Sequence, residues 1–244
     1  MPAVEPILLT VTQISTMNQG QVMTNATGFF FARGERLFLI TSRHVVINEP
    51  TNHRPDQLQI DVYVDTDNLA KTVSFSIPLY RDKQALWKQG SDSSGLIDVA
   101  AIPLQRDALP ESMVYRAFTP DTLCQPEATV EVGSPLMVVG FPLGFADTLH
   151  HLPVVRQAVL ASSFGLRFQG MGYFLTDALT HRGISGAPVV MRIDKSSPRE
   201  PDFHWLLLGV HSSRLDVGTR DLNEDEALGL NCAWYADIIM TLTE

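Results

Sequence analysis

The residues with the clearest potential for chemistry lie in the segment Gly183-Ile184-Ser185-Gly186, just before an apolar run. A serine hydroxyl attacks a carbonyl only when a general base accepts its proton and backbone donors hold the developing oxyanion. Glycines at the −2 and +1 positions permit a sharp turn, which would let the N–H groups of Gly183 and Ser185 point into one small hole. The motif predicts a nucleophile at Ser185, although Gly and Ser are also ordinary turn residues.

A candidate base and a candidate orienting carboxylate lie upstream of this serine. His44 directly follows two apolar runs, residues 29–31 and 37–40, whose spacing is typical of a β-hairpin. Asp98 is a single carboxylate entering an apolar strand, where a buried charge needs a partner such as a histidine cation. The chain order His44, Asp98, Ser185 is that of the chymotrypsin arrangement and differs from that of subtilisin and the α/β-hydrolases.

Five segments, in this order along the chain, resemble those of bacterial trypsin-like serine peptidases. They are Thr-Gly-Phe-Phe-Phe, Leu-Ile-Thr-Ser-Arg-His-Val-Val, Ile-Asp-Val-Ala-Ala-Ile, Val-Val-Gly-Phe-Pro-Leu-Gly and Gly-Ile-Ser-Gly-Ala-Pro-Val, and the resemblance spans roughly residues 20–215. It implies that Ser185 is the nucleophile, that His44 is the general base and later the acid, and that Asp98 orients His44. It also implies an oxyanion hole formed by the amides of Gly183 and Ser185, and a polypeptide substrate.

Each of these residues also has a purely structural interpretation. His44 could be a strand-end histidine bonded to backbone, Asp98 a turn or cap residue, and Ser185 a plain turn serine. A family member that has lost activity would keep the fold and bind a peptide or protein in its cleft. Because a catalytic triad is recognised by its geometry, the sequence leaves this catalytically silent alternative open.

Short strand-like runs broken by Gly, Pro, Asn and Asp recur along the chain and predict an all-β fold. The runs cover residues 7–11, 28–31, 37–40, 58–64, 73–78, 99–102, 130–132, 136–139, 154–162, 173–176, 188–193, 205–210 and 228–233. The stretch 107–127 contains three prolines and is interpreted as a crossover between two barrels. Together with the resemblance, this predicts two six-stranded antiparallel β-barrels of the chymotrypsin type, residues 1–118 and 119–244, with a short closing helix. His44 and Asp98 fall in the first barrel and Ser185 in the second, so we expect the site in the cleft between them.

Residues before the nucleophile and on a later strand are expected to wall the pocket for P1, the substrate residue whose carbonyl is attacked. Leu179 stands where basic-specific trypsins place an aspartate, so cleavage after Lys or Arg is not expected. Thr180, His211 and Ser212 form a pattern that resembles glutamyl endopeptidases and viral chymotrypsin-fold proteases that cleave after Gln or Glu. An imidazole N–H and a threonine hydroxyl can both donate to a carboxylate or amide oxygen. The alternative for His211 is a strand histidine that faces solvent or the domain edge.

The composition narrows the expected partners. The chain of 244 residues carries a formal net charge of −9 and has no basic run, so neither nucleic acid nor a membrane is an expected partner. The acidic stretch 221–226 is interpreted as solvated surface. The histidines have no zinc-like spacing with a third ligand, and neither a metal nor a cofactor is expected. The sequence does not indicate an oligomeric state.

The N-terminal segment and the cysteines bear on location and processing. The sequence begins without a basic segment or a long apolar run, so we expect no signal peptide or membrane span and favour a cytoplasmic location. Cys124 and Cys232 could pair, but two cysteines do not make a disulfide framework. Ile184 stands where pancreatic-type zymogens place an aspartate that pairs with a new N-terminal amine. We therefore expect an oxyanion hole that is either held by local packing as synthesised or ordered by a partner.

Overall fold

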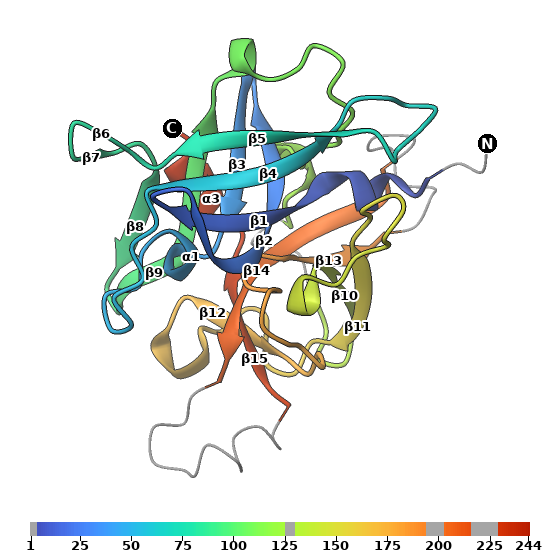
Figure 1. Cartoon of the computed structure of the whole chain (residues 1–244). Coiled ribbons are helices and arrows are strands. Elements are labelled where there is room, and N and C mark those ends of the chain that lie inside the picture. Colours follow the sequence, from blue (N-terminus) through green and yellow to red (C-terminus); the bar gives the residue numbers. More distant parts are fainter. Residues whose placement is uncertain (1–3, 125–129, 194–202, 216–228) are drawn as a thin grey trace.

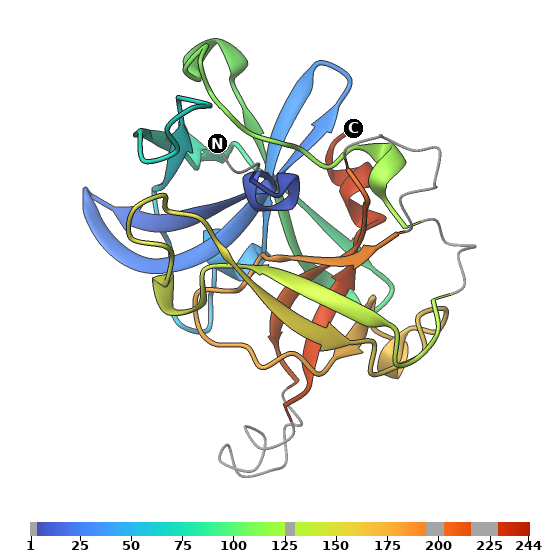
Figure 2. The ribbon, with the colours of Figure 1, turned by 90° about the vertical axis from the view of Figure 1, so that its right-hand side faces the viewer.

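Two curved antiparallel sheets make up most of the molecule (Figure 1). The structure is a computed structural model that describes residues 4–124, 130–193, 203–215 and 229–244. The first sheet has seven strands in the spatial order β5-β4-β1-β2-β3-β9-β8, and the second has six in the order β11-β10-β13-β14-β15-β12. In both views the first sheet lies above the second (Figures 1 and 2).

The first sheet is formed by β1 (Val11–Asn18), β2 (Gln21–Arg33), β3 (Arg36–Thr41), β4 (Gln57–Tyr63), β5 (Thr72–Pro78), β8 (Lys88–Asp92) and β9 (Gly95–Leu104). The second is formed by β10 (Pro135–Gly140), β11 (Val154–Val159), β12 (Tyr173–Thr176), β13 (Pro188–Arg192), β14 (Trp205–Arg214) and β15 (Asn231–Tyr235). A small separate hairpin pairs β6 (Tyr80–Arg81) with β7 (Gln84–Ala85). The short helices are η1 (Pro6–Thr10), α1 (Arg43–Val46), η2 (Arg106–Ala108), η3 (Pro120–Thr122), η4 (Pro142–Gly144), η5 (Phe168–Gly170) and α3 (Ile238–Leu242).

Strand β3, in the interior of the first sheet, buries both of its faces. Every residue of β3 after Arg36 is buried, and successive side chains of a strand point to opposite faces. Leu37 and Leu39 therefore pack into a core that belongs to the first sheet, whereas Phe38 and Ile40 pack into a second core. This two-sided burial explains why the strand is a continuous apolar run rather than an alternating one.

The second of these cores joins the two sheets. It contains Phe29, Phe31 and Val99 from the first sheet together with Val190, Leu207 and Trp234 from the second. Fully buried Phe118 packs edge-to-face on Phe29, with ring centroids 5.4 Å apart, and on Phe203 at 5.6 Å. The closing helix α3 also crosses between the halves, because it packs against β8 and β9 of the first sheet. The two halves are thus held against each other by a continuous hydrophobic interior.

The predicted all-β fold with a short C-terminal helix is confirmed, with one difference in strand number. The second sheet has the expected six strands, but the first has seven. β5 and β8 stand at opposite ends of the first sheet, and between them in sequence the chain leaves the sheet at residues 79–87 to form the β6–β7 hairpin. Buried Leu79 and Trp87 anchor the two ends of this excursion. The domain limits 1–118 and 119–244 remain a prediction.

Two local expectations from the strand pattern are wrong, and one strand was not expected. Residues 7–10 of the first run form the 3-10 helix η1, which Pro6 begins and which the Thr10 hydroxyl stabilises by donating to the Ile7 carbonyl. Residues 130–132 lead into a turn in which Ser134 N–H donates to Glu131 O, so they form no strand. Strand β8 was not expected, because its sequence is polar and it forms by pairing with β9.

Other expectations concern the cysteines, the acidic stretch and membrane crossing. No disulfide joins Cys124 to Cys232, both of which are among the described residues. The acidic stretch 221–226 lies outside the described residues. Within the part of the chain that the structure describes, no helix is both long and apolar enough to cross a bilayer.

Candidate active site

His44 lies on α1, a single helical turn that directly follows β3. The turn is fixed by its buried residues Val45 and Val46, which pack into the core of the first sheet. Its backbone is also tied to β9, because the His44 N–H donates to Asp98 Oδ1 at 2.8 Å. Contacts with the first sheet therefore fix the position of His44, and the predicted hairpin that precedes it is present as β2 and β3.

Asp98, on β9, accepts three hydrogen bonds that converge on its carboxylate. One is the backbone bond from His44, and the second joins Asp98 Oδ2 to His44 Nδ1 at 2.7 Å. The third comes from the Ser212 hydroxyl, which donates to the same oxygen at 2.5 Å. Because a carboxylate only accepts, Nδ1 of His44 is the donor of this bond, which leaves Nε2 as the nitrogen with a lone pair in the neutral form of the ring. The ring of His44 is thus oriented as a general base requires.

The loop that carries Ser185 is held against the segment that leads into α1. The carbonyl of His211, on β14, accepts both the Gly186 N–H at 2.8 Å and the Ser42 hydroxyl at 3.0 Å. Gly186 has a φ of +86°, and a Cβ on it would lie 2.2 Å from Thr41 Oγ1, so only glycine fits this close approach. The Ser185 hydroxyl makes no hydrogen bond with another described residue, His44 included. In unliganded enzymes such bonds are often formed only when substrate is bound.

The amides of Gly183 and Ser185 are available to bind an anion. Neither N–H donates a hydrogen bond within the described part of the chain. The carbonyl of Arg182 accepts from the Leu143 N–H at 2.5 Å, so the N–H of the same trans peptide, which belongs to Gly183, points the opposite way. Gly183 has a φ of +92°, and a Cβ there would lie 2.6 Å from the Phe141 carbonyl oxygen. Two such N–H groups, two residues apart, are the donor set that an oxyanion requires.

A model of the trypsin-like peptidase domain matches residues 26–195, which is more than half of the chain. The chain belongs to this family. Among solved structures, it is similar to a serine endoprotease from Yersinia pestis, with a TM-score of 0.57 and 14% identity over 100% of this chain and 66% of that one. It is also similar to human heparin binding protein, with a TM-score of 0.56 and 19% identity over 99% of this chain and 94% of that one. No curated protein matches the sequence.

At these identities the structural likeness shows the fold alone, which is the chymotrypsin fold. The chain spans slightly less than two thirds of the length of the Yersinia endoprotease. His44, Asp98 and Ser185 all lie inside the matched residues 26–195. His211 and Ser212 lie beyond the matched range, so their contribution rests on the contacts described here.

In this trypsin-like peptidase domain, the side chain of His211 is enclosed. It is 2% exposed, and its Nδ1 has no hydrogen-bond partner among the described residues. Burial, helped by the nearby His44 and opposed by Asp98, lowers the pKa of His211 to about 4. The ring is therefore neutral at pH 7. The solvent-facing part of the alternative for His211 is wrong, and the other part, a position at the domain edge, stays a prediction.

The other two residues expected to face the substrate side chain are already engaged. Thr180 is buried, and its hydroxyl donates to Asn231 Oδ1 at 2.6 Å. Asn231 is itself fixed on β15, because its amide nitrogen donates to the Ala178 carbonyl at 2.7 Å. The Ser212 hydroxyl is used by Asp98. The sequence analysis placed Ser212 in the pocket and did not predict its contact with Asp98. The available signal was its position directly after His211, because successive side chains of a strand point to opposite faces.

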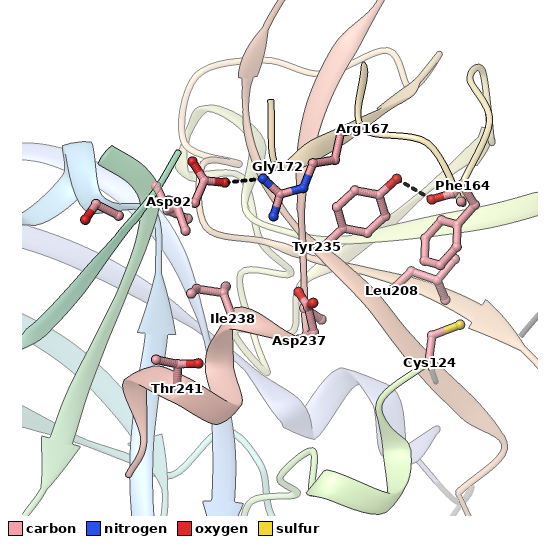
Figure 3. A pocket seen from close by; sticks show the side chains of 14 residues that line it. Asp92, Cys124, Phe164, Arg167, Gly172, Leu208, Tyr235, Asp237, Ile238 and Thr241 are labelled. Atoms are coloured by element: carbon pink, nitrogen blue, oxygen red, sulfur yellow. Dashed lines mark hydrogen bonds and ion pairs between the residues drawn. The ribbon is translucent and has the colours of Figure 1, made fainter. Parts of the chain in front are cut away.

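A separate cavity of about 410 Å³ lies between the two sheets and α3 (Figure 3). Its lining includes Ile97, Phe164, Leu208 and Ile238, and an ion pair between Arg167 and Asp92, 2.6 Å long, borders it. None of the predicted catalytic or substrate-binding residues lines this cavity. The candidate site is therefore the cluster around His44, Asp98 and the Ser185 loop, and not this cavity.

Proposed function

We propose that this trypsin-like peptidase domain is a serine endopeptidase whose catalytic residues are Ser185, His44 and Asp98. The observation that carries the proposal is the carboxylate-oriented imidazole of His44 beside a loop whose Gly183 and Ser185 amides are unbonded. An orienting carboxylate and a pair of unbonded donors can serve developing charge, and neither is needed for a plain strand end or turn. The hydrogen bond between Ser185 and His44 is expected to form when substrate is bound.

The chemistry proceeds through an acyl-enzyme. Ser185 Oγ attacks the peptide carbonyl carbon as His44 Nε2 takes the hydroxyl proton, and the carbonyl oxygen becomes an oxyanion held by the Gly183 and Ser185 N–H groups. The intermediate collapses when the carbon–nitrogen bond breaks and His44 gives its proton to the departing amine. Water then attacks the ester with His44 again as base, which releases the acid product and restores Ser185. Asp98 stabilises the imidazolium at each stage and does not itself gain a proton.

For specificity, we propose a preference for Gln or Glu at P1, with His211 as the donor. Support comes from its burial and from the unpartnered Nδ1, since a buried polar atom without a partner is costly unless a ligand supplies one. A neutral imidazole can donate to the side-chain oxygen of either residue. Thr180 is a weaker candidate than the sequence suggested, because its hydroxyl proton is directed to Asn231.

A peptide library randomised at P1 tests both parts of the proposal. Purified wild-type protein is incubated with the library beside Ser185→Ala, and cleavage sites are read by mass spectrometry. We expect cleavage after Gln or Glu with the wild type and none with Ser185→Ala. His211→Leu should keep activity but lose the preference.

Two other outcomes separate the alternatives. Strong preference for Lys, Arg or large aromatic residues would contradict the role of His211 while leaving the endopeptidase intact. A wild-type protein that cleaves no peptide, and behaves like Ser185→Ala throughout, would instead be a catalytically silent module of this fold.

A further inference from the structure

The loop that carries Ser185 is anchored at every carbonyl from residue 182 to residue 185. Two of these four hydrogen bonds come from one residue, Thr27. Its hydroxyl donates to the Gly183 carbonyl at 2.7 Å, and its backbone N–H donates to the Ser185 carbonyl at 3.0 Å. The other two donors are backbone N–H groups. Thr27 is therefore the side-chain anchor of this loop, from a position 156 residues before Gly183 in the sequence.

Thr27 is itself held in one orientation. It lies on β2 of the first sheet and is fully buried. Its hydroxyl oxygen accepts the Phe141 N–H at 3.1 Å, and its carbonyl accepts the Thr41 hydroxyl at 2.8 Å. A side chain that both donates and accepts in a closed environment cannot rotate without leaving buried groups unpaired. The anchor is consequently rigid.

The bonds from Thr27 alternate with the candidate oxyanion donors along the loop. The peptides that join residues 182 to 183 and 184 to 185 contribute the N–H groups of Gly183 and Ser185. The peptides that follow each of them, 183 to 184 and 185 to 186, have carbonyls that bind Thr27. Because neighbouring peptides share a Cα, the bonds from Thr27 restrain the peptide planes that lie next to each donor peptide.

We infer that Thr27 is a positioning residue that sets the oxyanion hole in the resting protein. This inference rests on the proposed function and extends it, because Thr27 contacts the Ser185 loop and not the substrate. It also explains how the hole is formed without a new N-terminal amine. Ile184 is 1% exposed and packs in the core of the second sheet, so the loop is fixed by the Thr27 hydroxyl on one side and by apolar contacts on the other.

Loss of the Thr27 hydroxyl would unpair two buried groups at once, the Gly183 carbonyl and the Phe141 N–H. A buried unpaired carbonyl is costly, which favours rotation of its peptide toward another partner. Gly183 already has a positive φ and, as glycine, the backbone freedom to rotate. Rotation of the 183–184 peptide would also shift the Gly183 Cα that it shares with the 182–183 peptide, and this would displace the Gly183 N–H from the position proposed for oxyanion binding.

The test compares Thr27→Val, which has the same shape without the hydroxyl, with Thr27→Ser, which keeps it. Removing one oxyanion donor from a serine protease typically lowers kcat by about 10²- to 10³-fold. Because Thr27→Val misplaces a donor rather than deleting it, we expect kcat to fall by about 10- to 100-fold with KM nearly unchanged. Affinity for a peptide boronic acid, whose tetrahedral adduct occupies the hole, should fall in parallel, and Thr27→Ser should restore both.

Thr16→Val is the matched control. Thr16 is also fully buried on the first sheet, and its hydroxyl also accepts a backbone N–H, that of Thr24, at 3.0 Å and donates to the Thr24 carbonyl at 3.2 Å. It lies at the far end of the β1–β2 pair and makes no contact with the loop that carries Ser185. Thr16→Val should lose stability like Thr27→Val and keep the wild-type kcat. If Thr27→Val yields no folded protein, Thr27→Cys replaces it, since a thiol is a weak donor, and the same loss relative to Thr27→Ser is expected.

The outcomes distinguish this inference from the proposed function. A Thr27→Val protein with wild-type kcat, or a Thr27→Ser protein as impaired as Thr27→Val, would overturn the role of the hydroxyl in an otherwise active enzyme. An equal kcat loss in Thr16→Val would overturn it too, because the effect would then be one of stability alone. An inert wild-type protein, equal to Ser185→Ala, would instead refute the proposed function and the inference with it.

Discussion

Replacing His211 by glutamine should flatten the loss of stability at acid pH. Burial lowers the pKa of His211 from 6.5 to about 4 in the folded protein, while the unfolded chain keeps the ordinary value. Between these two pH values the unfolded chain binds a proton at His211 and the folded protein does not, so protonation favours unfolding. Above pH 6.5 both states are neutral at this residue, and below pH 4 both are protonated. The cost therefore accumulates as the pH falls from about 6.5 to about 4.

The size of the effect follows from the pKa difference. Each pKa unit corresponds to about 1.4 kcal/mol, so the shift of His211 corresponds to about 3 kcal/mol once the pH reaches 4. This is a large fraction of the 5–15 kcal/mol of stability that is typical of a folded domain. Glutamine does not titrate, so the His211→Gln protein avoids this component of acid destabilisation.

Urea unfolding followed by tryptophan fluorescence measures the effect directly. Both proteins carry Ser185→Ala, so that neither cleaves unfolded chains during the experiment, and ΔG of unfolding is determined at pH 7, 6, 5 and 4. The difference in ΔG between His211→Gln and the reference should move by about 3 kcal/mol in favour of the variant between pH 7 and pH 4. A difference that stays constant across this range would refute the assignment of a buried neutral imidazole.

Three further changes test the site and the core. Ser212→Ala removes one of the three hydrogen bonds to Asp98. A hydrogen bond to a charged group contributes about 1.5–3 kcal/mol, so we expect kcat/KM on the best library peptide to fall at least about tenfold. An unchanged kcat/KM would mean that the Ser212 hydroxyl does not contribute to catalysis. Gly183→Ala places a Cβ 2.6 Å from the Phe141 carbonyl oxygen, so the backbone must shift and the Gly183 N–H with it. We therefore expect kcat to fall by about 10²-fold or more. A wild-type kcat would mean that the Gly183 amide is not an oxyanion donor. Phe118→Ala opens a cavity in the core that the two sheets share, and it should lower the ΔG of unfolding by about 3–5 kcal/mol in urea titrations. A loss below about 1 kcal/mol would mean that this core does not hold the two halves together.

The general fold and the pairing of His44 with Asp98 could be predicted because their signals are local. A histidine that directly follows a buried hairpin strand is fixed in position by that strand, and a lone carboxylate entering an apolar strand must find a partner. Asp98 lies on the first sheet and His44 on the helical turn that directly follows strand β3 of that sheet, so their contact at 2.7 Å needed no knowledge of the second sheet. The glycines around Ser185 were informative for the same reason, since their positive φ values are a property of the loop itself.

The contacts that could not be predicted join segments far apart in sequence. Thr27 gives no sequence signal beyond a buried strand residue, because its role depends on where a loop of the second sheet meets β2. Ser212 is similar: its hydroxyl turns to Asp98 on the other sheet. The polar strand β8 also escaped prediction, since pairing with β9 and not side-chain pattern makes it a strand.

The central claim is that Ser185 is a nucleophile activated by His44, and covalent labelling tests it most directly. The wild-type protein, Ser185→Ala and His44→Ala are each treated with a fluorophosphonate, and the modified residue is mapped by mass spectrometry. The account predicts one adduct in the wild type, on Ser185, and none in either variant within the same time. A folded wild-type protein that remains unlabelled, or one labelled at a residue other than Ser185, would contradict it.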